Sequence, residues 1–412
     1  MQILVINSGS SSIKFSIFEA HAPHGGNVPT VTPRSLFEGE LSDIGEAEST
    51  LTIHATGVGA EKSATKKVGI RGVEQAIAEV LDVVSGSGLP AFGAVGYRVV
   101  HPGPKLREHV RITPEVLVDL EAASEFAPLH DPEAVQMIRA FMDKFPALPH
   151  YACFDTVFHQ TMPVEASTYP LPPEYAARGV RRYGFHGLSC ESIVRQLKRA
   201  GAVPRRMVIA HLGSGCSVTA LVDGRSVDTT MGLTPTGGVV MGTRSGDLDP
   251  GLVLYLLRGE KGDRTAEVEA LLNHRAGLVA LSGMENNVKA IRAAAETNAR
   301  ATLALKIFTR SVTKAMGGFS WLLGGLDAIV FAGGIGEHDP QTRAEVVGGL
   351  GALGVSLDAL LNLNRDRAQN GGLTDGIQRI SSNDSPTAVL VVPAREDQMI
   401  AVHVEEMARE VD

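Results

Sequence analysis

Two segments of the chain share one pattern of apolar and polar positions. Residues 3–18 (ILVINSGSSSIKFSIF) predict a strand, a short turn of glycine and serine, and a second strand. Residues 207–222 (MVIAHLGSGCSVTALV) repeat this plan. A further strand-like segment follows each unit, at 34–41 and at 225–231. The repetition predicts that the chain folds as two halves built in the same way.

Helical and strand-like patterns then alternate in both halves. In the first half, a helical pattern at 73–84 precedes an apolar strand at 94–100. In the second half, a long helical stretch at 286–318 precedes a strand at 328–334. Strands grouped at the start of each half, and later strands that alternate with helices, are typical of an α/β fold with mixed sheets. We therefore expect a duplicated α/β domain with a cleft between its halves.

Two other segments are assigned by polarity and spacing. The polar stretch at 56–67 (TGVGAEKSATKK) predicts a loop. Residues 396–411 carry apolar side chains at helical spacing. A terminal helix needs a partner for its apolar face, so we expect this helix to pack on the first half.

Composition narrows the class of protein. The chain has 412 residues, of which 44% are apolar and 20% are charged, a balance typical of a folded protein with two domains. Its formal net charge of −8 argues against nucleic acid or an anionic membrane as the main partner. An anionic substrate would therefore need a local cluster of basic side chains.

The cysteines and the apolar runs indicate the cellular compartment in which we expect the protein. Cys153, Cys190 and Cys216 are odd in number and widely spaced, which fits neither a disulfide framework nor a metal site. The sequence has no basic start followed by an apolar signal segment, and no apolar run as long as a membrane span. These features predict a soluble, cytoplasmic protein.

Three glycine-rich turns are candidates for binding phosphate. The turn at 8–14 (SGSSSIK) has small residues whose backbone N–H groups can approach an anion, and Lys14 adds a positive charge. A plain hairpin is the alternative, and the spacing is too short for a Walker loop. The turns at 211–215 (HLGSG) and 333–338 (GGIGEH) also follow apolar strands. The three turns together favour a nucleotide-phosphate site.

Several charged side chains occupy unusual positions. Arg98 lies in an apolar run, where it needs either an internal carboxylate or an anionic ligand. His186 and Arg244 lie in glycine-rich loops, which suit catalytic residues better than core residues. Asp155 and Glu396 are candidate carboxylates, although each could also be a helix cap or a solvated charge. These residues are the candidates for chemistry on an anion.

Nine motifs occur in the order and spacing of a known family. They are INSGSSSIKF, RVVHPGPK, APLHDP, FDTVFHQTMP, RRYGFHG, HLGSG, MGTRSGDLDP, AGGIGE and PAREDQMIA. Over nearly its whole length the chain resembles the acetate kinase family. The resemblance implies two duplicated ribonuclease H-like domains of the actin and sugar-kinase type, at 1–157 with 395–412 and at 158–394. It also implies the reaction ATP + acetate ⇌ ADP + acetyl phosphate with Mg²⁺ (or Mn²⁺), a homodimer, and a role in acetyl-CoA biosynthesis.

The resemblance assigns roles residue by residue. Asp155, His186 and Arg244 correspond to catalytic residues, and Asn7 and Glu396 correspond to the magnesium site. The positions that correspond to the substrate site are Arg98, His130, Val100, Leu129, Phe185 and Pro235. The positions that correspond to the nucleotide site are Lys14, His211, Leu212, Gly213, Ser214, Gly215, Asn287, Val288, Lys289, Gly334, Ile335, Gly336, Glu337 and His338.

Most departures from the family lie among the nucleotide residues. Asn287 and Lys289 replace Asp and Arg, while Ser214 and His338 each replace Asn. Asn287 offers no charged acceptor, and Lys289 lacks the planar fork of arginine. We therefore expect turnover with ATP, but a raised nucleotide KM and weak discrimination between ATP, GTP and pyrophosphate. The alternative is that neighbouring residues compensate and ATP is bound normally. Other atypical positions are Asp131, Cys190 and Gly237.

The implied mechanism is electrostatic and needs no general base, because acetate is already ionised at neutral pH. Arg98 would bind the carboxylate, and Asp155 would orient its neighbours rather than take a proton. Four alternatives stay open at this point. They are a propionate or butyrate kinase of the same family, an acetate kinase with a donor other than ATP, a nucleotide-binding module without chemistry, and an actin-like ATPase.

Overall fold

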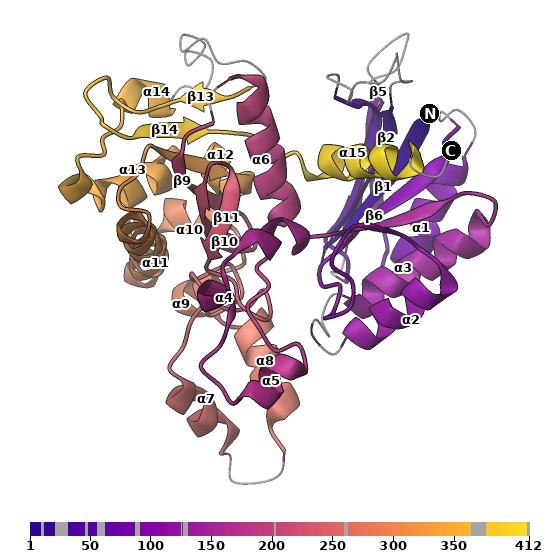
Figure 1. Cartoon of the computed structure of the whole chain (residues 1–412), viewed down its shortest axis with the longest axis horizontal. Helices are drawn as coiled ribbons and strands as arrows, with labels where there is room; N and C mark the ends of the chain where they lie inside the picture. The colour runs from indigo at the N-terminus through magenta and orange to yellow at the C-terminus, as the bar shows by residue number, and fades with distance from the viewer. Residues whose placement is uncertain are drawn as a thin grey trace. The chain divides into compact units, whose positions relative to one another are not determined.

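A computed structural model of the chain divides into two compact units, Met1–Val157 with Arg395–Asp412 and Phe158–Ala394 (Figure 1). The first unit therefore takes its last helix from the far end of the sequence. The residues that the structure describes are 1–9, 12–20, 32–45, 48–55, 62–86, 91–124, 126, 131–201, 203–258, 263–363 and 376–409.

The first unit is built on an eight-stranded mixed sheet in the order β5-β4-β3-β2-β1-β6-β8-β7. Strands β1 to β5 pair antiparallel in sequence order. β6 and β8 run parallel to β1, and β7 pairs antiparallel with β8. The strands are β1 (Gln2–Ser8), β2 (Ser12–Glu19), β3 (Arg34–Ser42), β4 (Ser49–Ala55), β5 (Lys62–Val68), β6 (Ala94–Val99), β7 (Val110–Arg111) and β8 (His150–Phe154).

Helices cover both faces of this sheet, because alternate side chains of the buried strands point to opposite faces. On one face, Leu4 and Tyr97 join a core that includes apolar residues of α1, α2 and α3. α15, drawn in yellow in Figure 1, contacts β1 and β6. The helices are α1 (Val73–Ser85), α2 (Pro114–Ala123), α3 (Asp131–Lys144) and α15 (Glu396–Arg409). The predicted packing of the terminal helix on the first half is thus confirmed.

The second unit contains a six-stranded mixed sheet in the order β11-β10-β9-β12-β14-β13. β9, β10 and β11 pair antiparallel, β12 runs parallel to both β9 and β14, and β13 pairs antiparallel with β14. The strands are β9 (Arg206–Leu212), β10 (Cys216–Val222), β11 (Arg225–Thr229), β12 (Ala328–Ala332), β13 (Gln378–Arg379) and β14 (Ala388–Val391).

Helices surround the second sheet as well. α6 packs its apolar side onto β9 and β12 through residues such as Ile193 and Leu197, while α11 contacts β9 and β10. The helices are α4 (Val164–Ser167), α5 (Pro173–Ala177), α6 (Gly187–Arg199), α7 (Pro250–Leu257), α8 (Thr265–His274), α9 (Gly277–Ser282), α10 (Val288–Ala294), α11 (Ala299–Leu322), α12 (Gly333–His338), α13 (Pro340–Gly348) and α14 (Ala359–Leu363), with 3₁₀ turns η1 (Val157–Thr161) and η2 (Gly351–Leu353).

The two sheets repeat one topology. The order β3-β2-β1-β6-β8-β7 in the first unit corresponds strand for strand to β11-β10-β9-β12-β14-β13 in the second. In both, three antiparallel strands come first in sequence, two parallel strands follow, and a short antiparallel strand closes the edge. The predictions of mixed sheets and of two halves built alike are confirmed.

Of three local predictions, two are wrong, and the third, a helical stretch, is confirmed as helical but is interrupted. The stretch at 56–67 is not a loop throughout, because Lys62–Val68 forms edge strand β5, whose lysines are typical of a protected sheet edge. The helical stretch at 286–318 is two helices, since Asn298 accepts hydrogen bonds from Arg300 and Ala301 as the N-cap of α11. The third glycine turn, Gly333–His338, is the short helix α12 rather than a turn.

Two further observations concern the state of the cysteines and the apolar content of the helices. Cys153, Cys190 and Cys216 are buried thiols, with no disulfide bond among them. Among the helices that the structure describes, none combines the length and the apolar content that a membrane crossing needs.

Gly96 sets how closely α15 approaches the first sheet. A methyl group added at Gly96 would lie 2.5 Å from Cγ2 of Val404 and 2.9 Å from Cγ2 of Ile400, both on α15. Gly96→Ala should therefore lower the free energy of unfolding by about 1–3 kcal/mol, the usual cost of overpacking a core. Urea titration measures this change. Gly69→Ala is the matched control, because a methyl group there meets nothing within 4 Å.

The second substitution Val404→Ala removes the nearer of the two methyl groups that clash. The double variant should be more stable than the sum of the two single changes predicts, by about 0.5–3 kcal/mol. Additive effects of the two substitutions would show that Gly96 does not set the packing of α15.

Candidate active site

Strand pairing places three polar residues on one face of the first sheet. In the β1–β2 ladder, Asn7 lies opposite Lys14 and Val5 lies opposite Ser16. Directly opposed residues share a face, as do residues two positions apart on one strand. Asn7, Lys14 and Ser16 therefore project to the same side of the sheet.

Arg98 projects to this side as well. Gly96, two positions earlier on β6, lies opposite Val5 in the parallel β1–β6 ladder. α15 covers this side, and its first two residues are Glu396 and Asp397. Segments that are almost 400 residues apart in sequence thus meet at one end of the sheet.

Arg98 and Asp155 form an ion pair in the interior of the first unit. The Nη2 of Arg98 donates to Oδ2 of Asp155 at 2.5 Å, and Nε lies 3.1 Å from both carboxylate oxygens. The Asp155 side chain is fully buried, and that of Arg98 is 15% exposed. Burial alone would lower the pKa of Arg98, but the charges of Asp155 and Glu396 raise it above its usual value. Of the two alternatives left open for Arg98, the structure shows the internal carboxylate partner.

The guanidinium of Arg98 keeps donors available. Besides the bonds to Asp155, its Nη1 makes one long contact of 3.4 Å to Oδ1 of Asn7. A guanidinium has five N–H donors, and within the described part of the chain no further acceptor contacts this one. The remaining donors suit a carboxylate ligand, whose two oxygens match the planar fork.

Asn7 links Arg98 to the start of α15. Its Nδ2 donates to Oδ1 of Asp397 at 2.7 Å and lies 3.5 Å from Oε2 of Glu396. The other carboxylate oxygen of Asp397 accepts a long bond of 3.5 Å from Ser16. We call the set Asn7, Arg98, Asp155, Glu396 and Asp397 the Arg98 cluster.

Asp397 is a cluster residue that sequence reasoning missed. Burial raises its pKa, while the hydrogen bond from Asn7 and the charge of Lys14 oppose that shift. The only signal in the sequence is its place beside Glu396 at the start of a helix, and many acidic residues occupy such positions as caps. Its contact with Asn7 emerges only when the chain end returns to the first strand.

The remaining substrate-site candidates of the first unit are described in part. Val100 follows β6 and is 8% exposed. Leu129 and His130 lie outside the described residues.

In the second unit, His186 is held in an unusual backbone conformation. It precedes α6 with φ of 59°, in the left-handed region that few residues other than glycine adopt. Its Nδ1 is 3.0 Å from Oγ of Ser217, and its ring stacks on His211 with centroids 4.2 Å apart. His211 in turn is 2.8 Å from the hydroxyl of Ser189. Neighbouring strands and α6 therefore fix the direction of the His186 ring.

Arg244 lies beside His186 at the second glycine turn. A methyl group added at Gly215 would lie 3.3 Å from Nε2 of His186 and 3.5 Å from Nη1 of Arg244. Nη1 of Arg244 donates to the carbonyl of Pro235 at 3.1 Å. The absence of a side chain at Gly215 lets an imidazole and a guanidinium approach the same turn. Phe185, next in sequence to His186, is 1% exposed and belongs to the core.

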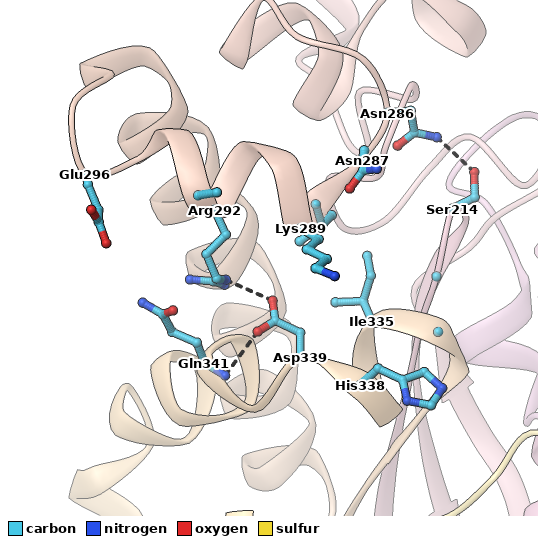
Figure 2. Close-up of a pocket in the computed structure, with 14 residues that line it drawn as sticks. Ser214, Asn286, Asn287, Lys289, Arg292, Glu296, Ile335, His338, Asp339 and Gln341 are labelled. Carbon is cyan, nitrogen blue, oxygen red and sulfur yellow. Dashed lines mark hydrogen bonds and ion pairs between the residues drawn. The ribbon is translucent and has the colours of Figure 1, made fainter. Parts of the chain in front are cut away.

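A pocket of about 680 Å³ opens beside this turn (Figure 2). α10, α12 and the 213–214 turn supply most of its wall. Its lining residues are Gly213, Ser214, Asn286, Asn287, Val288, Lys289, Arg292, Ala293, Glu296, Gly334, Ile335, His338, Asp339 and Gln341. The volume falls in the range of small-molecule sites. Eight of the fourteen nucleotide-site candidates line it, drawn from the glycine-rich segments 211–215 and 333–338 and from residues 287–289.

Several polar groups of the pocket are already engaged. Arg292 donates to Asp339 at 3.0 Å, and Asp339 also caps α13 through the backbone N–H of Gln341 (Figure 2). Oδ1 of Asn287 accepts from the N–H of Ala290 and so caps α10. Lys289 has no ion pair within the described part of the chain. Its ammonium group is available to a ligand.

The half-buried side chain of Glu337 and the buried side chain of Arg343 hold α12 at the pocket. The carboxylate of Glu337 accepts N–H bonds from Gly333 at 3.1 Å and from Ala394 at 3.0 Å. At the other end, Nη1 of Arg343 donates to the carbonyls of Gly336 and Glu337 at 2.8 and 2.9 Å. A six-residue helix is unstable by itself, so these contacts at both ends are what keep it formed.

The similarity of the chain to known proteins agrees with this geometry. Residues 2–402 match the model of the acetokinase family. The chain belongs to the acetokinase family. The acetate kinases of Micrococcus luteus and Halothermothrix orenii are each 40% identical to it, over 99% and 97% of this chain and 100% and 98% of their own length.

Solved structures of the family share the fold. The acetate kinase of Porphyromonas gingivalis has a TM-score of 0.80 at 32% identity and covers 99% of both chains. A propionate kinase from Francisella tularensis has a TM-score of 0.82 at 33% identity, over 97% of this chain and 98% of that one. The chain therefore has the duplicated actin and sugar-kinase-like fold and is a kinase that acts on a carboxylate.

Arg343, which is 2% exposed, gives a test of the pocket. Lysine at this position keeps the charge but cannot reach Asn362 and both α12 carbonyls together, and each buried acceptor left unpaired costs about 1–3 kcal/mol. Arg343→Lys should therefore loosen α12 and weaken ADP binding by about tenfold, measured by titration calorimetry. Arg310→Lys, at an exposed position, is the control. Unchanged ADP affinity in Arg343→Lys would contradict the role of this contact.

Proposed function

We propose that this protein transfers a phosphoryl group reversibly between ATP and acetate, giving ADP and acetyl phosphate. The observation that carries the proposal is the Arg98 cluster, in which a largely buried guanidinium keeps donors open for a small carboxylate. The curated relatives quoted above are named acetate kinases, which favours acetate over propionate. A cytoplasmic location and a role in acetyl-CoA biosynthesis are part of the proposal.

Two anions must approach each other in this reaction, so the protein has to offset their repulsion. An oxygen of the acetate carboxylate attacks the γ-phosphorus, and the bond from that phosphorus to the β–γ bridging oxygen breaks. In the proposal, Arg98 binds the carboxylate, while Arg244 and His186 donate hydrogen bonds to the transferring group. No proton moves, because the attacking carboxylate is already ionised at neutral pH.

Asp155 has a positioning role in this scheme. Its carboxylate accepts both Nε and Nη2 of Arg98, which fixes the plane of the guanidinium. A buried carboxylate committed to two charge-assisted bonds is a poor proton acceptor. This separates the proposed mechanism from that of a sugar kinase, where an acid must accept a hydroxyl proton.

Asn7 and Glu396 fit the proposed magnesium site. Their amide and carboxylate oxygens are donors of the kind that Mg²⁺ prefers, and Nδ2 of Asn7 lies 3.5 Å from Oε2 of Glu396. Such an ion supplies positive charge to the phosphate oxygens when it is bound, and Mn²⁺ takes the same ligands. Two protein ligands suffice, because Mg²⁺ keeps several waters and substrate oxygens.

Substitution of the two arginines tests the assignment. Arg244→Ala should lower kcat by about 10²–10³, because its donors would act on the transition state. Arg98→Lys should mainly raise the KM for acetate, since a lysine keeps the charge but not the fork. ADP release coupled to a dehydrogenase measures both constants. Near-normal turnover in Arg244→Ala would show that the mechanism is wrong, and Arg310→Lys serves again as the control.

We expect the protein to select its phosphoryl donor mainly through contacts with the phosphate groups. Asn287 is committed to capping α10, and Lys289 lacks the fork that a family arginine would offer. We expect kcat/KM for ATP, GTP and pyrophosphate to differ by less than about a hundredfold, or about 2.8 kcal/mol. Asn287→Asp preserves the helix cap, because both residues cap well. Together with Lys289→Arg it should increase the preference for ATP over GTP.

Initial rates with each donor at saturating acetate and magnesium decide this point. A wild-type preference for ATP above about a hundredfold would show that the pocket recognises the base despite these residues. Lys306→Arg, on α11 and outside the pocket, is the control for the second substitution.

We propose that the protein is a homodimer and that the end of α11 contributes to the interface. Trp321 is 82% exposed and Leu322 is 61% exposed, which is unusual for large apolar side chains at adjacent positions. Gly317 and Gly318, one turn earlier, have no neighbouring atoms within 4 Å of an added methyl group. Such a surface suits close approach by a second copy of the chain.

Trp321→Glu should shift the protein from dimer to monomer, because a buried charge without a partner opposes association. Light scattering coupled to size-exclusion chromatography measures the mass. Leu360→Glu, at another exposed apolar position, should leave the mass unchanged. A monomeric wild-type protein would contradict the homodimer, and a dimeric Trp321→Glu would contradict this interface.

A further inference from the structure

Asp131 is a buried acid that the mechanism above does not use. It is the first residue of α3, and only 1% of its surface is exposed. Its Oδ1 accepts one hydrogen bond, from the backbone N–H of His101 at 3.3 Å. Its Oδ2 is buried and has no hydrogen-bond partner among the described residues. One long bond from a neutral donor is far less than an ionised carboxylate needs in the interior.

Among the described residues, two charged groups act on Asp131. Arg98 on β6 attracts a negative charge there, whereas Asp155, after β8, repels it. His101 faces Asp131 through its backbone N–H, and its Nδ1 accepts from Gly103 and so carries no proton. Burial raises the pKa of Asp131 well above the usual range, the bond from His101 opposes this, and Asp155 adds to it. Burial is the largest of these influences and the attraction of Arg98 is the smallest, so Arg98 does not cancel the cost of burial.

We propose that Asp131 is a neutral carboxylic acid in the working enzyme, and that its ionisation at higher pH weakens binding of the carboxylate substrate to Arg98. The proton leaves to water and a negative charge remains in the interior. Arg98 would then experience the negative charge of Asp131 in addition to the charges of Asp155, Glu396 and Asp397. The attraction left for a substrate carboxylate falls accordingly. This inference rests on the proposed function, because it takes Arg98 as the carboxylate-binding residue.

The state of Asp131 also has a consequence for stability that does not depend on any activity. Its pKa is higher in the folded than in the unfolded chain, so the folded state binds the proton more tightly. Below the unfolded pKa of about 3.9 both states are protonated and the residue contributes equally to each. As pH rises from there through the folded pKa, the unfolded state is increasingly favoured. A neutral side chain at this position should therefore stabilise the protein, and by more at pH 7 than at pH 4.

Asp131→Asn gives the first test, because asparagine keeps the shape and the Oδ1 acceptor but never ionises. The melting temperature of the full chain is measured from about pH 4 to about pH 9 by calorimetry, beside the wild type. We expect the variant to melt higher than the wild type near neutral pH, with a difference that shrinks towards pH 4. Asp143→Asn, at an exposed position on the same helix, should show no such trend. A difference that does not change with pH would overturn the proposed protonation state.

The second test is the pH profile of the KM for acetate. In the wild type it should rise by about threefold to tenfold as Asp131 ionises, whereas in Asp131→Asn it should stay low and flat. Asp143→Asn should follow the wild type. The same rise in Asp131→Asn as in the wild type would overturn the link to Arg98. If the wild type forms no acetyl phosphate at all, the proposed function fails, and the melting curves still decide whether Asp131 is protonated.

Discussion

The buried ion pair between Arg98 and Asp155 constrains much of the first unit. A guanidinium in the interior must have a carboxylate, and removing one partner of such a pair costs about 3–5 kcal/mol. The pair forms because β6 and β8 run parallel and adjacent, with Arg98 opposite Cys153 and Asp155 two positions further on. The arrangement of the central strands therefore decides where the positive charge is available.

The same constraint explains why the end of the chain returns to its beginning. Asn7 contacts Arg98 with its oxygen and Asp397 with its amide nitrogen, so one side chain connects β1, β6 and α15. α15 packs by an apolar face that needs the first sheet, and this packing delivers Glu396 and Asp397 to the cluster. Packing and chemistry thus depend on the same helix.

Much of the fold follows from periodicity in the sequence. The strands at the start of each half, the alternation of helices and strands, and the terminal helix all show apolar positions at spacing of two or of three to four residues. Periodicity does not predict edge strand β5, because its exposed lysines give no apolar pattern. Periodicity does not predict α12 either, because three of its six residues are glycine. The stability of this helix comes from contacts made by Arg343 and Glu337 rather than from helix propensity.

Sequence reasoning could identify a site residue only where that residue type costs free energy in its local surroundings. Arg98 in an apolar strand and His186 among glycines stand out from the sequence by themselves. Asp397, Arg343 and Asp131 do not, because an acid at the start of a helix or an arginine within one is common. Their roles depend on partners that the fold brings from distant segments, such as Asn7 for Asp397. Chain connectivity, and not local composition, defines this part of the site.

The central claim is that the attacking group is a carboxylate and that the product is an acyl phosphate. Hydroxylamine converts an acyl phosphate to a hydroxamate and does not react with ADP or inorganic phosphate in this way. The wild-type protein should form acetohydroxamate from ATP, acetate, magnesium and hydroxylamine, with one ADP released for each hydroxamate. Release of ADP and phosphate without hydroxamate would identify an ATPase instead and would contradict the account.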